Sequence, residues 1–226
     1  MLETAPQPTV PPRDLTAPEN EARLTAHRLT CVRDDRPLFR ELSFTVGLGE
    51  VLQVEGRNGS GKTSLLRILC GLATPAEGEV RWRGQPLSRV RYDYWLDLAY
   101  LGHAHGVKLE LTPIENLRLA RALKRPHPAM GIEDALERVG LLGFEDVPAR
   151  SLSAGQCRRV ALARLLATRA RVWILDEPLT AIDRRGVTEI EALIVDHARA
   201  GGSVVLTTHH AVRLSGCRVS SLLLAA

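Results

Sequence analysis

The chain has 226 residues, a formal net charge of +4 and hydrophobic residues at 45% of its positions. This length allows one large α/β domain, or one domain with a small inserted subdomain, around a sizeable core. The mild basic excess suits an anionic ligand or a membrane surface, but it is too small to indicate a nucleic-acid-binding protein. No run approaches the roughly 18 apolar residues that a membrane span requires, so a membrane role would need a partner.

The first 20 residues contain five of the chain's thirteen prolines and almost no apolar periodicity. Such a composition buries too little apolar surface to offset the entropy lost on folding. We therefore expect residues 1–20 to form a disordered tail and residues 21–226 to form the folded domain.

Four cysteines, Cys31, Cys70, Cys157 and Cys217, are widely spaced along the chain. They include no C-x-x-C pair, and we recognise no secretory leader. We therefore expect them to be reduced thiols of a cytosolic protein. Cys70 is expected in the core.

Segments in which apolar and polar residues alternate, LTAHRLTCV and LFRELSFTVGLGEVLQVEG, are typical of strands. They lead into GRNGSGKT at residues 56–63, which fits the phosphate-binding pattern G-x-x-x-x-G-K-[ST]. Lys62 would supply a mobile positive charge for the β and γ phosphates, and Thr63 a hydroxyl for Mg²⁺. A helix should follow and end near Gly71, a natural left-handed stop. A chance glycine-rich turn is the alternative, which the flanking strand and helix pattern disfavours.

The phosphate loop needs glycines because its backbone N–H groups must close around phosphate oxygens, and the start of the following helix adds free N–H groups and its dipole. The residues that we expect to bind the phosphates are Gly56, Arg57, Asn58, Gly59, Ser60, Gly61, Lys62, Thr63 and Ser64.

Arginines and aromatic residues are interleaved between residues 81 and 95, a stretch that begins inside the strand-like segment EVRWRG. Interleaved residues of these types can bind single-stranded nucleic acid. We favour the alternative, an exposed amphipathic strand followed by a loop whose aromatic side chains pack inward.

A helical insertion is predicted at about residues 111–150. Thr112, Pro113 and Glu115 have the spacing of a capping box with proline at the first helical position. A second short helix, IEDALERVGLLG, should end at Gly140 or Gly143. Before this insertion, AYLGHAHGV is typical of a strand that ends in a loop.

The pentapeptide LSAGQ at residues 152–156 precedes the helical run CRRVALARLLA. Ser153 and Gln156 have capping-box spacing, so a well-capped helix is the plain interpretation. A helix that starts Ser-x-Gly can also bind an anion through its hydroxyl and backbone N–H groups. The pentapeptide alone leaves both interpretations open.

The apolar segment VWILDEP predicts a buried strand that ends in two carboxylates, Asp176 and Glu177. A parallel sheet places such residues at its ligand-binding carboxyl edge. Asp176 would hold Mg²⁺, and Glu177 would orient or deprotonate the attacking water. The alternative is a strand with acidic residues in the next turn. SVVLTTHH is a second buried-strand pattern, and it ends near His209.

These motifs, together with LTAID, resemble the ATP-binding cassette of ABC transporters in their order, over about residues 24–208. The resemblance implies an α/β P-loop NTPase fold with a parallel-sheet core, an antiparallel β lobe and a helical insertion. It also implies Mg²⁺-dependent ATP hydrolysis by a homodimer of cassettes that face head to tail. Ser153, Gly155 and Gln156 would then contact the ATP of the other chain. Lys62, Glu177 and His209 would be catalytic, with His209 sensing the γ-phosphate.

The segments YLGHAHGVKLELTPIENL and LTCVRDDRPLF resemble the ATPase subunits of bacterial cytochrome c biogenesis transporters. This resemblance implies a peripheral protein on the cytoplasmic face of the inner membrane, attached to a multi-span membrane subunit. The ATPase would drive haem export or the release of a haem chaperone.

Two positions depart from most cassettes. His103 stands where a glutamine usually reaches Mg²⁺ and the membrane partner, so we expect an imidazole near the metal and nucleotide in place of the usual glutamine amide. Arg33 stands near the position of the aromatic ring that stacks on adenine, so stacking would be by guanidinium or weak.

Direct haem binding is not expected, because the chain has no C-x-x-C-H motif and His105 and His127 are scattered. One alternative function is a cassette that serves another transported substrate. A soluble mechanical cassette is a second, but such proteins commonly have two cassettes or a long coiled coil, and we expect no nucleic-acid partner. A regulatory module without turnover is a third, which the presence of Glu177 and His209 disfavours.

Overall fold

The structure is a computed structural model that describes residues 24–104, 106–124, 130–180, 182–208, 212 and 214–224. The predicted tail at 1–20 and the histidines His105, His127 and His209 lie outside these residues. In the part described, no helix is long and apolar enough to cross a membrane.

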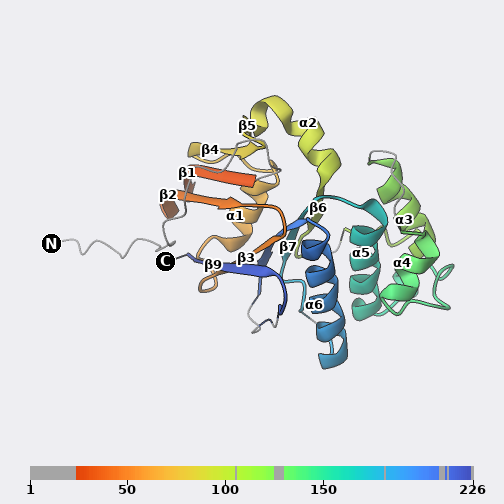
Figure 1. Cartoon of the computed structure of the whole chain (residues 1–226). Helices are drawn as coiled ribbons and strands as arrows, with labels where there is room; N and C mark the ends of the chain where they lie inside the picture. Colours follow the sequence, from red (N-terminus) through yellow and green to blue (C-terminus); the bar gives the residue numbers. More distant parts are fainter. Residues whose placement is uncertain are drawn as a thin grey trace.

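Two β-sheets form the centre of the molecule (Figure 1). The five-stranded sheet is parallel, in the order β6-β7-β8-β3-β9. Its strands are β3 (Glu50–Glu55), β6 (Leu98–Leu101), β7 (Val172–Asp176), β8 (Ser203–Thr207) and β9 (Arg218–Leu223). The four-stranded sheet is antiparallel, in the order β2-β1-β4-β5. Its strands are β1 (Leu24–Arg33), β2 (Arg36–Val46), β4 (Glu77–Trp82) and β5 (Gln85–Pro86). The predicted α/β fold, with a parallel core and an antiparallel lobe, is confirmed.

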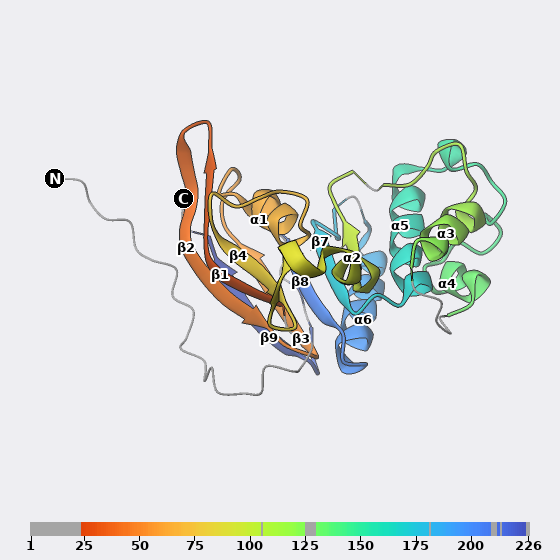
Figure 2. The ribbon, with the colours of Figure 1, turned by 90° about the horizontal axis from the view of Figure 1, so that it is seen from above.

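Helices lie on both sides of the parallel sheet. They are α1 (Lys62–Leu69), α2 (Leu87–Asp97), α3 (Pro113–Ala122), α4 (Ile132–Arg138), α5 (Ala154–Thr168) and α6 (Arg184–Arg199), with a 3₁₀ turn at Ala149–Ser151. Figure 2 shows α1 between the two sheets, α5 and α6 on the other side of the parallel sheet, and α3 and α4 beyond α5. The phosphate-loop helix and the helix that follows LSAGQ are therefore on opposite sides of the sheet.

Strand β7 shows why this sheet needs cover on both faces. All five of its residues are buried. Trp173 and Leu175 pack into the core that contains residues of α5 and α6, whereas Val172 and Ile174 pack into the core that contains α1 and the antiparallel lobe. A strand that is buried on both faces has a nearly continuous apolar sequence, as VWIL does. This burial fixes the strand and presents Asp176 at its carboxyl end.

The segment 87–97 corrects a prediction, because it forms helix α2 rather than a loop. Leu87 and Tyr94, on either side of Val90, are both buried. The Tyr94 hydroxyl donates to the carbonyl oxygen of Leu69 at 2.9 Å. The expectation that aromatic side chains pack inward is right for Tyr94 but wrong for Tyr92, which is 74% exposed. Helix α2 is kinked at Val90, which weakened the helical pattern in the sequence.

The predicted helix ends agree with the structure where capping residues define them. Thr112 and Glu115 form the reciprocal capping box at the start of α3. Gly140 follows α4 with φ +71°. Because α3 and α4 share the hydrophobic core with α5, the boundaries of a separate helical subdomain at about 111–150 stay a prediction.

His197 on α6 stacks against Trp173 with ring centroids 3.9 Å apart and an interplanar angle of 5°. The backbone closes over the imidazole, since a Cβ at Gly202 would lie only 2.1 Å from its Nε2. Burial lowers the pKa of His197 to about 4, although a hydrogen bond with the backbone of Arg171 opposes the shift. The folded protein therefore keeps this imidazole neutral well below the ordinary histidine range.

We predict that acid destabilises the fold through His197. The unfolded chain binds a proton there near pH 6.5 and the folded chain only near pH 4. Lowering the pH from 7 to 5 should therefore reduce the free energy of unfolding by about 2 kcal/mol from this group. Urea unfolding at both pH values should show that the free energy of unfolding falls less between pH 7 and pH 5 in His197→Phe, a variant that keeps a ring stacked on Trp173. His27→Phe is the control at an exposed position of β1. Equal losses in the parent and His197→Phe would contradict the assignment.

Candidate active site

The phosphate loop connects β3 to α1, and its three glycines, Gly56, Gly59 and Gly61, all have positive φ angles that other residues rarely adopt. Gly56 has φ +147°, and a Cβ there would lie 2.5 Å from the Ser60 hydroxyl and 2.8 Å from the carbonyl oxygen of Leu224. Gly61 caps α1 in the left-handed conformation, at φ +96°. The glycines therefore permit a turn that brings backbone N–H groups toward one point.

Two polar side chains of this loop suit a phosphate group. The Ser60 hydroxyl is buried and has no hydrogen-bond partner in the part of the chain that the structure describes. Lys62 is folded back on the loop, where its Nζ donates to the carbonyl oxygens of Gly56 at 2.7 Å and Arg57 at 3.2 Å. No acidic residue lies in the first turn of α1. The loop thus offers hydrogen-bond donors and a positive charge, and the first turn of α1 adds no carboxylate of its own.

Asp176 is the residue around which the catalytic edge is arranged. Its carboxylate accepts hydrogen bonds from the Thr63 hydroxyl at 2.9 Å and from the Thr207 hydroxyl at 2.8 Å. It is only 3% exposed. The structure therefore brings together two residues predicted as metal ligands, Thr63 and Asp176. Hydroxyl and carboxylate oxygens are ligands that Mg²⁺ accepts, so this pair fits the ion.

Thr207 was not recognised from the sequence. It pairs with Asp176 in the register of β7 and β8, and its hydroxyl also accepts a hydrogen bond from the backbone N–H of Glu177 at 3.0 Å. The signal that could have identified it is the pairing of two buried parallel strands, whose carboxyl ends meet at one edge.

Glu177 leaves the line of β7 through a left-handed turn. Its φ is +51°, which is uncommon for a residue with a side chain. Such conformations cost about 1–3 kcal/mol and persist where surrounding contacts hold them, often at functional sites. The turn ends the strand directly after Asp176.

Ser153 and Gln156 form the predicted capping box at the start of α5. The Ser153 hydroxyl accepts from the N–H of Gln156 at 3.2 Å, and the Gln156 side chain accepts from the N–H of Ser153 at 2.9 Å. Ser153 is exposed, and Gly155 is half-buried. Helix α5 lies on the opposite side of the parallel sheet from α1 (Figure 2).

The structure places His103 and Arg33 at exposed positions. His103 is exposed, two residues beyond Leu101, whose strand partner is Leu175 on β7. Arg33 ends β1, and its side chain is 74% exposed, with Nε 3.7 Å from the carboxylate of Asp34. Within the described ranges, no hydrogen bond or ion pair joins either side chain to the phosphate loop. His209 lies outside those ranges.

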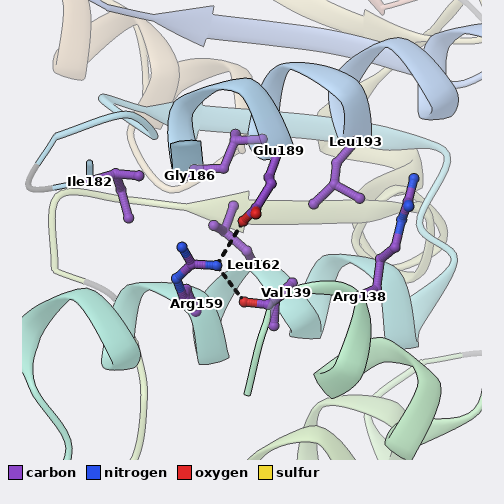
Figure 3. A pocket seen from close by; sticks show the side chains of 9 residues that line it. Arg138, Val139, Arg159, Leu162, Ile182, Gly186, Glu189 and Leu193 are labelled. Carbon is purple, nitrogen blue, oxygen red and sulfur yellow. Dashed lines mark hydrogen bonds and ion pairs between the residues drawn. The ribbon is translucent and has the colours of Figure 1, made fainter. Parts of the chain in front are cut away.

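A pocket lies between α5, α6 and the end of α4 (Figure 3). Arg159 on α5 donates to the carbonyl oxygen of Val139 at 2.6 Å and to the carboxylate of Glu189 at 2.9 Å. The pocket contains none of the predicted nucleotide-binding residues. Its contacts instead join three helices of the core.

Comparison with known proteins agrees with this geometry. The family model described as "ABC transporter" matches residues 39–180. The chain belongs to the ABC transporter family. It is an ABC-type ATPase, as its ordered motifs predicted.

Curated relatives carry the name "Cytochrome c biogenesis ATP-binding export protein CcmA". The protein from Methylococcus capsulatus is 53% identical over 205 residues, which cover 90% of this chain and 99% of that protein. One from Yersinia pestis is 55% identical over 186 residues, 82% of this chain and 85% of that protein. The predicted resemblance to the cytochrome c biogenesis subfamily is therefore confirmed.

Solved cassettes have the same fold. A putative ABC transporter ATP-binding protein from Pyrococcus furiosus has a TM-score of 0.74 at 27% identity, covering 89% of this chain and 98% of that one. A dimeric cassette in a post-hydrolysis state, bound to ADP and Pi, has a TM-score of 0.77 at 22% identity. The match covers 90% of this chain and 97% of that one.

We predict that Lys62→Ala weakens ATP binding by about tenfold to a hundredfold, the usual effect of removing a charged hydrogen bond. The affinity for a fluorescent ATP analogue measures this loss. Lys108→Ala, which changes an exposed lysine, is the control and should bind as the parent does. Unchanged affinity in Lys62→Ala would show that the loop does not use this charge.

Proposed function

We propose that this ATPase is the ATP-hydrolysing subunit of a membrane transporter complex in cytochrome c biogenesis. The main observation behind the proposed chemistry is that the hydroxyls of Thr63 and Thr207 both donate hydrogen bonds to the Asp176 carboxylate. The turn that contains Glu177 follows directly and is bonded to Thr207 as well. The pathway is inferred from relatives that are more than half identical and are named for it. The complex would lie at the cytoplasmic face of the bacterial inner membrane, with this chain bound to a multi-span membrane subunit.

In the proposed mechanism, Lys62 and the N–H groups of the phosphate loop bind the β and γ phosphates of ATP. Thr63 and Asp176 would hold Mg²⁺, which when bound polarises the phosphoryl oxygens and neutralises their charge. Glu177 orients the attacking water and accepts its proton. His209 would contact the γ-phosphate, and Arg33 would lie against the adenine.

The proposed active site needs a second cassette. Ser153, Gly155 and Gln156 start a helix on the far side of the sheet from α1, so they would contact the ATP of a partner cassette rather than their own. A homodimer facing head to tail would then contain two composite sites. The isolated chain should be a weak ATPase for this reason.

We predict that Glu177→Gln binds ATP but does not hydrolyse it, because the amide accepts no proton from the attacking water. ATP should trap this variant as a dimer that elutes earlier in size-exclusion chromatography. Glu133→Gln, an exposed change on α4, is the control and should behave as the parent. Turnover at the parental rate in Glu177→Gln would exclude the catalytic role.

The same variant tests the pathway. A bacterium that lacks its own subunit of this type should regain haem-stained c-type cytochromes with the parent chain but not with Glu177→Gln. Haem-loaded chaperone should accumulate with the variant if ATP drives chaperone release. Normal cytochrome maturation with Glu177→Gln would contradict the proposed function.

His103 is proposed to lie near the metal, since it follows the strand next to β7. If it contributes a Mg²⁺ ligand, His103→Ala should raise the Mg²⁺ concentration for half-maximal turnover several-fold. His103→Gln should not, because a glutamine oxygen can replace the imidazole nitrogen. Identical Mg²⁺ titrations for both variants and the parent would remove His103 from the metal site and leave contact with the membrane subunit as its role.

A further inference from the structure

Arg158 lies on α5, five residues beyond Ser153, and is only 2% exposed. Its guanidinium is directed at the turn after β7. Nε donates to the carbonyl oxygen of Pro178 at 3.3 Å, and Nη2 to that of Asp176 at 3.4 Å. Nη2 also donates to the carbonyl oxygen of Glu177. One side chain therefore binds three consecutive carbonyl groups around Glu177.

This turn depends on contacts from outside its own segment. Glu177 adopts φ +51°, and its N–H is already bonded to Thr207 on β8. A buried carbonyl group left without a donor costs about 1–3 kcal/mol. Arg158 supplies donors on the carbonyl side, and Thr207 supplies the acceptor on the N–H side. The turn is thus fixed between α5 and β8.

An arginine suits this position better than a lysine. The guanidinium is a rigid planar fork with five N–H donors, whereas an ammonium is a single point from which donors rotate. Burial lowers the pKa of Arg158, but the carboxylates of Asp176 and Glu177 act in the opposite direction. Their charges compensate the buried cation.

We propose that Arg158 is the positioning residue of Glu177: by fixing the turn at 176–178, it sets where that carboxylate stands relative to the attacking water. The inference rests on the proposed catalytic role of Glu177. Arg158 acts within its own chain, although its helix begins with the residues proposed to meet the partner's ATP.

Arg158→Lys should lower kcat at least tenfold and leave the affinity for ATP within twofold, because the carboxylate is displaced while the phosphate loop is intact. Arg150→Lys is the matched control. It makes the same change in an exposed side chain that pairs with Glu110, and it should keep the parental kcat. An unchanged kcat in Arg158→Lys would overturn the proposal.

A double variant separates positioning from a general structural role. In the Glu177→Gln background, Arg158→Lys should leave ATP-trapped dimer formation unchanged, which also shows that the chain folds and binds nucleotide. Loss of trapping would overturn the proposal in favour of a structural role for Arg158.

Mixed dimers test whether Arg158 acts in its own chain. In a dimer of the parent with Glu177→Gln/Arg158→Lys, the one working carboxylate keeps its own Arg158. In a dimer of Glu177→Gln with Arg158→Lys, the working carboxylate has lost it. Two affinity tags can isolate each mixed dimer. The dimer whose working carboxylate keeps its own Arg158 should hydrolyse ATP at least tenfold faster than the dimer whose working carboxylate has lost it.

The reverse order of rates would show that Arg158 acts on the helix start that meets the partner's ATP, and it would overturn the proposal. Active Glu177→Gln homodimers would instead refute the catalytic role of Glu177 in the proposed function. The two failures are therefore distinguishable.

Discussion

The carboxylate of Asp176 joins three elements that are far apart in the sequence. It accepts hydrogen bonds from Thr63 on α1 and Thr207 on β8, and it ends β7. Hydrogen bonds to charged groups contribute about 1.5–3 kcal/mol each, more than most polar contacts. These bonds consequently fix the position of Asp176, the proposed metal ligand, relative to the phosphate loop and to the turn of Glu177.

That relation depends in turn on a sheet covered on both faces. Val172 and Ile174 pack on one side of β7, and Trp173 and Leu175 on the other, so the strand cannot slip by one residue without exchanging its two buried faces. The register sets Asp176 opposite Thr207. Arg158 and Thr207 then hold the next residue, Glu177, from opposite sides. Hydrophobic packing therefore determines the geometry of a polar site.

Much of this could be predicted from the sequence because the signals are local. Glycine spacing identified the phosphate loop, and capping boxes marked the starts of α3 and α5. The continuous apolar run of β7 predicted a buried strand that ends in carboxylates. Helix α2 was missed because it is kinked at Val90 and its aromatic residues divide between buried Tyr94 and exposed Tyr92.

The contacts of Thr207 and Arg158 were missed for a different reason. They join positions 31 and 18–20 residues apart in the chain, and no local spacing encodes such pairs. Strand register and the packing of α5 against β7 had to be known first. The roles of His103, Arg33 and His209 stay predictions, because they depend on nucleotide, metal or residues outside the described ranges.

The central claim is that each active site combines the phosphate loop of one chain with the Ser153 helix start of another. Mixing two inactive variants tests it most directly, because Lys62→Ala removes one half of a site and Ser153→Arg obstructs the other half. In a mixed dimer, the phosphate loop of the Ser153→Arg chain would face the intact helix start of the Lys62→Ala chain. The account predicts that the mixture hydrolyses ATP well above either variant alone. A mixture as inactive as its components, although mixed dimers form, would contradict it.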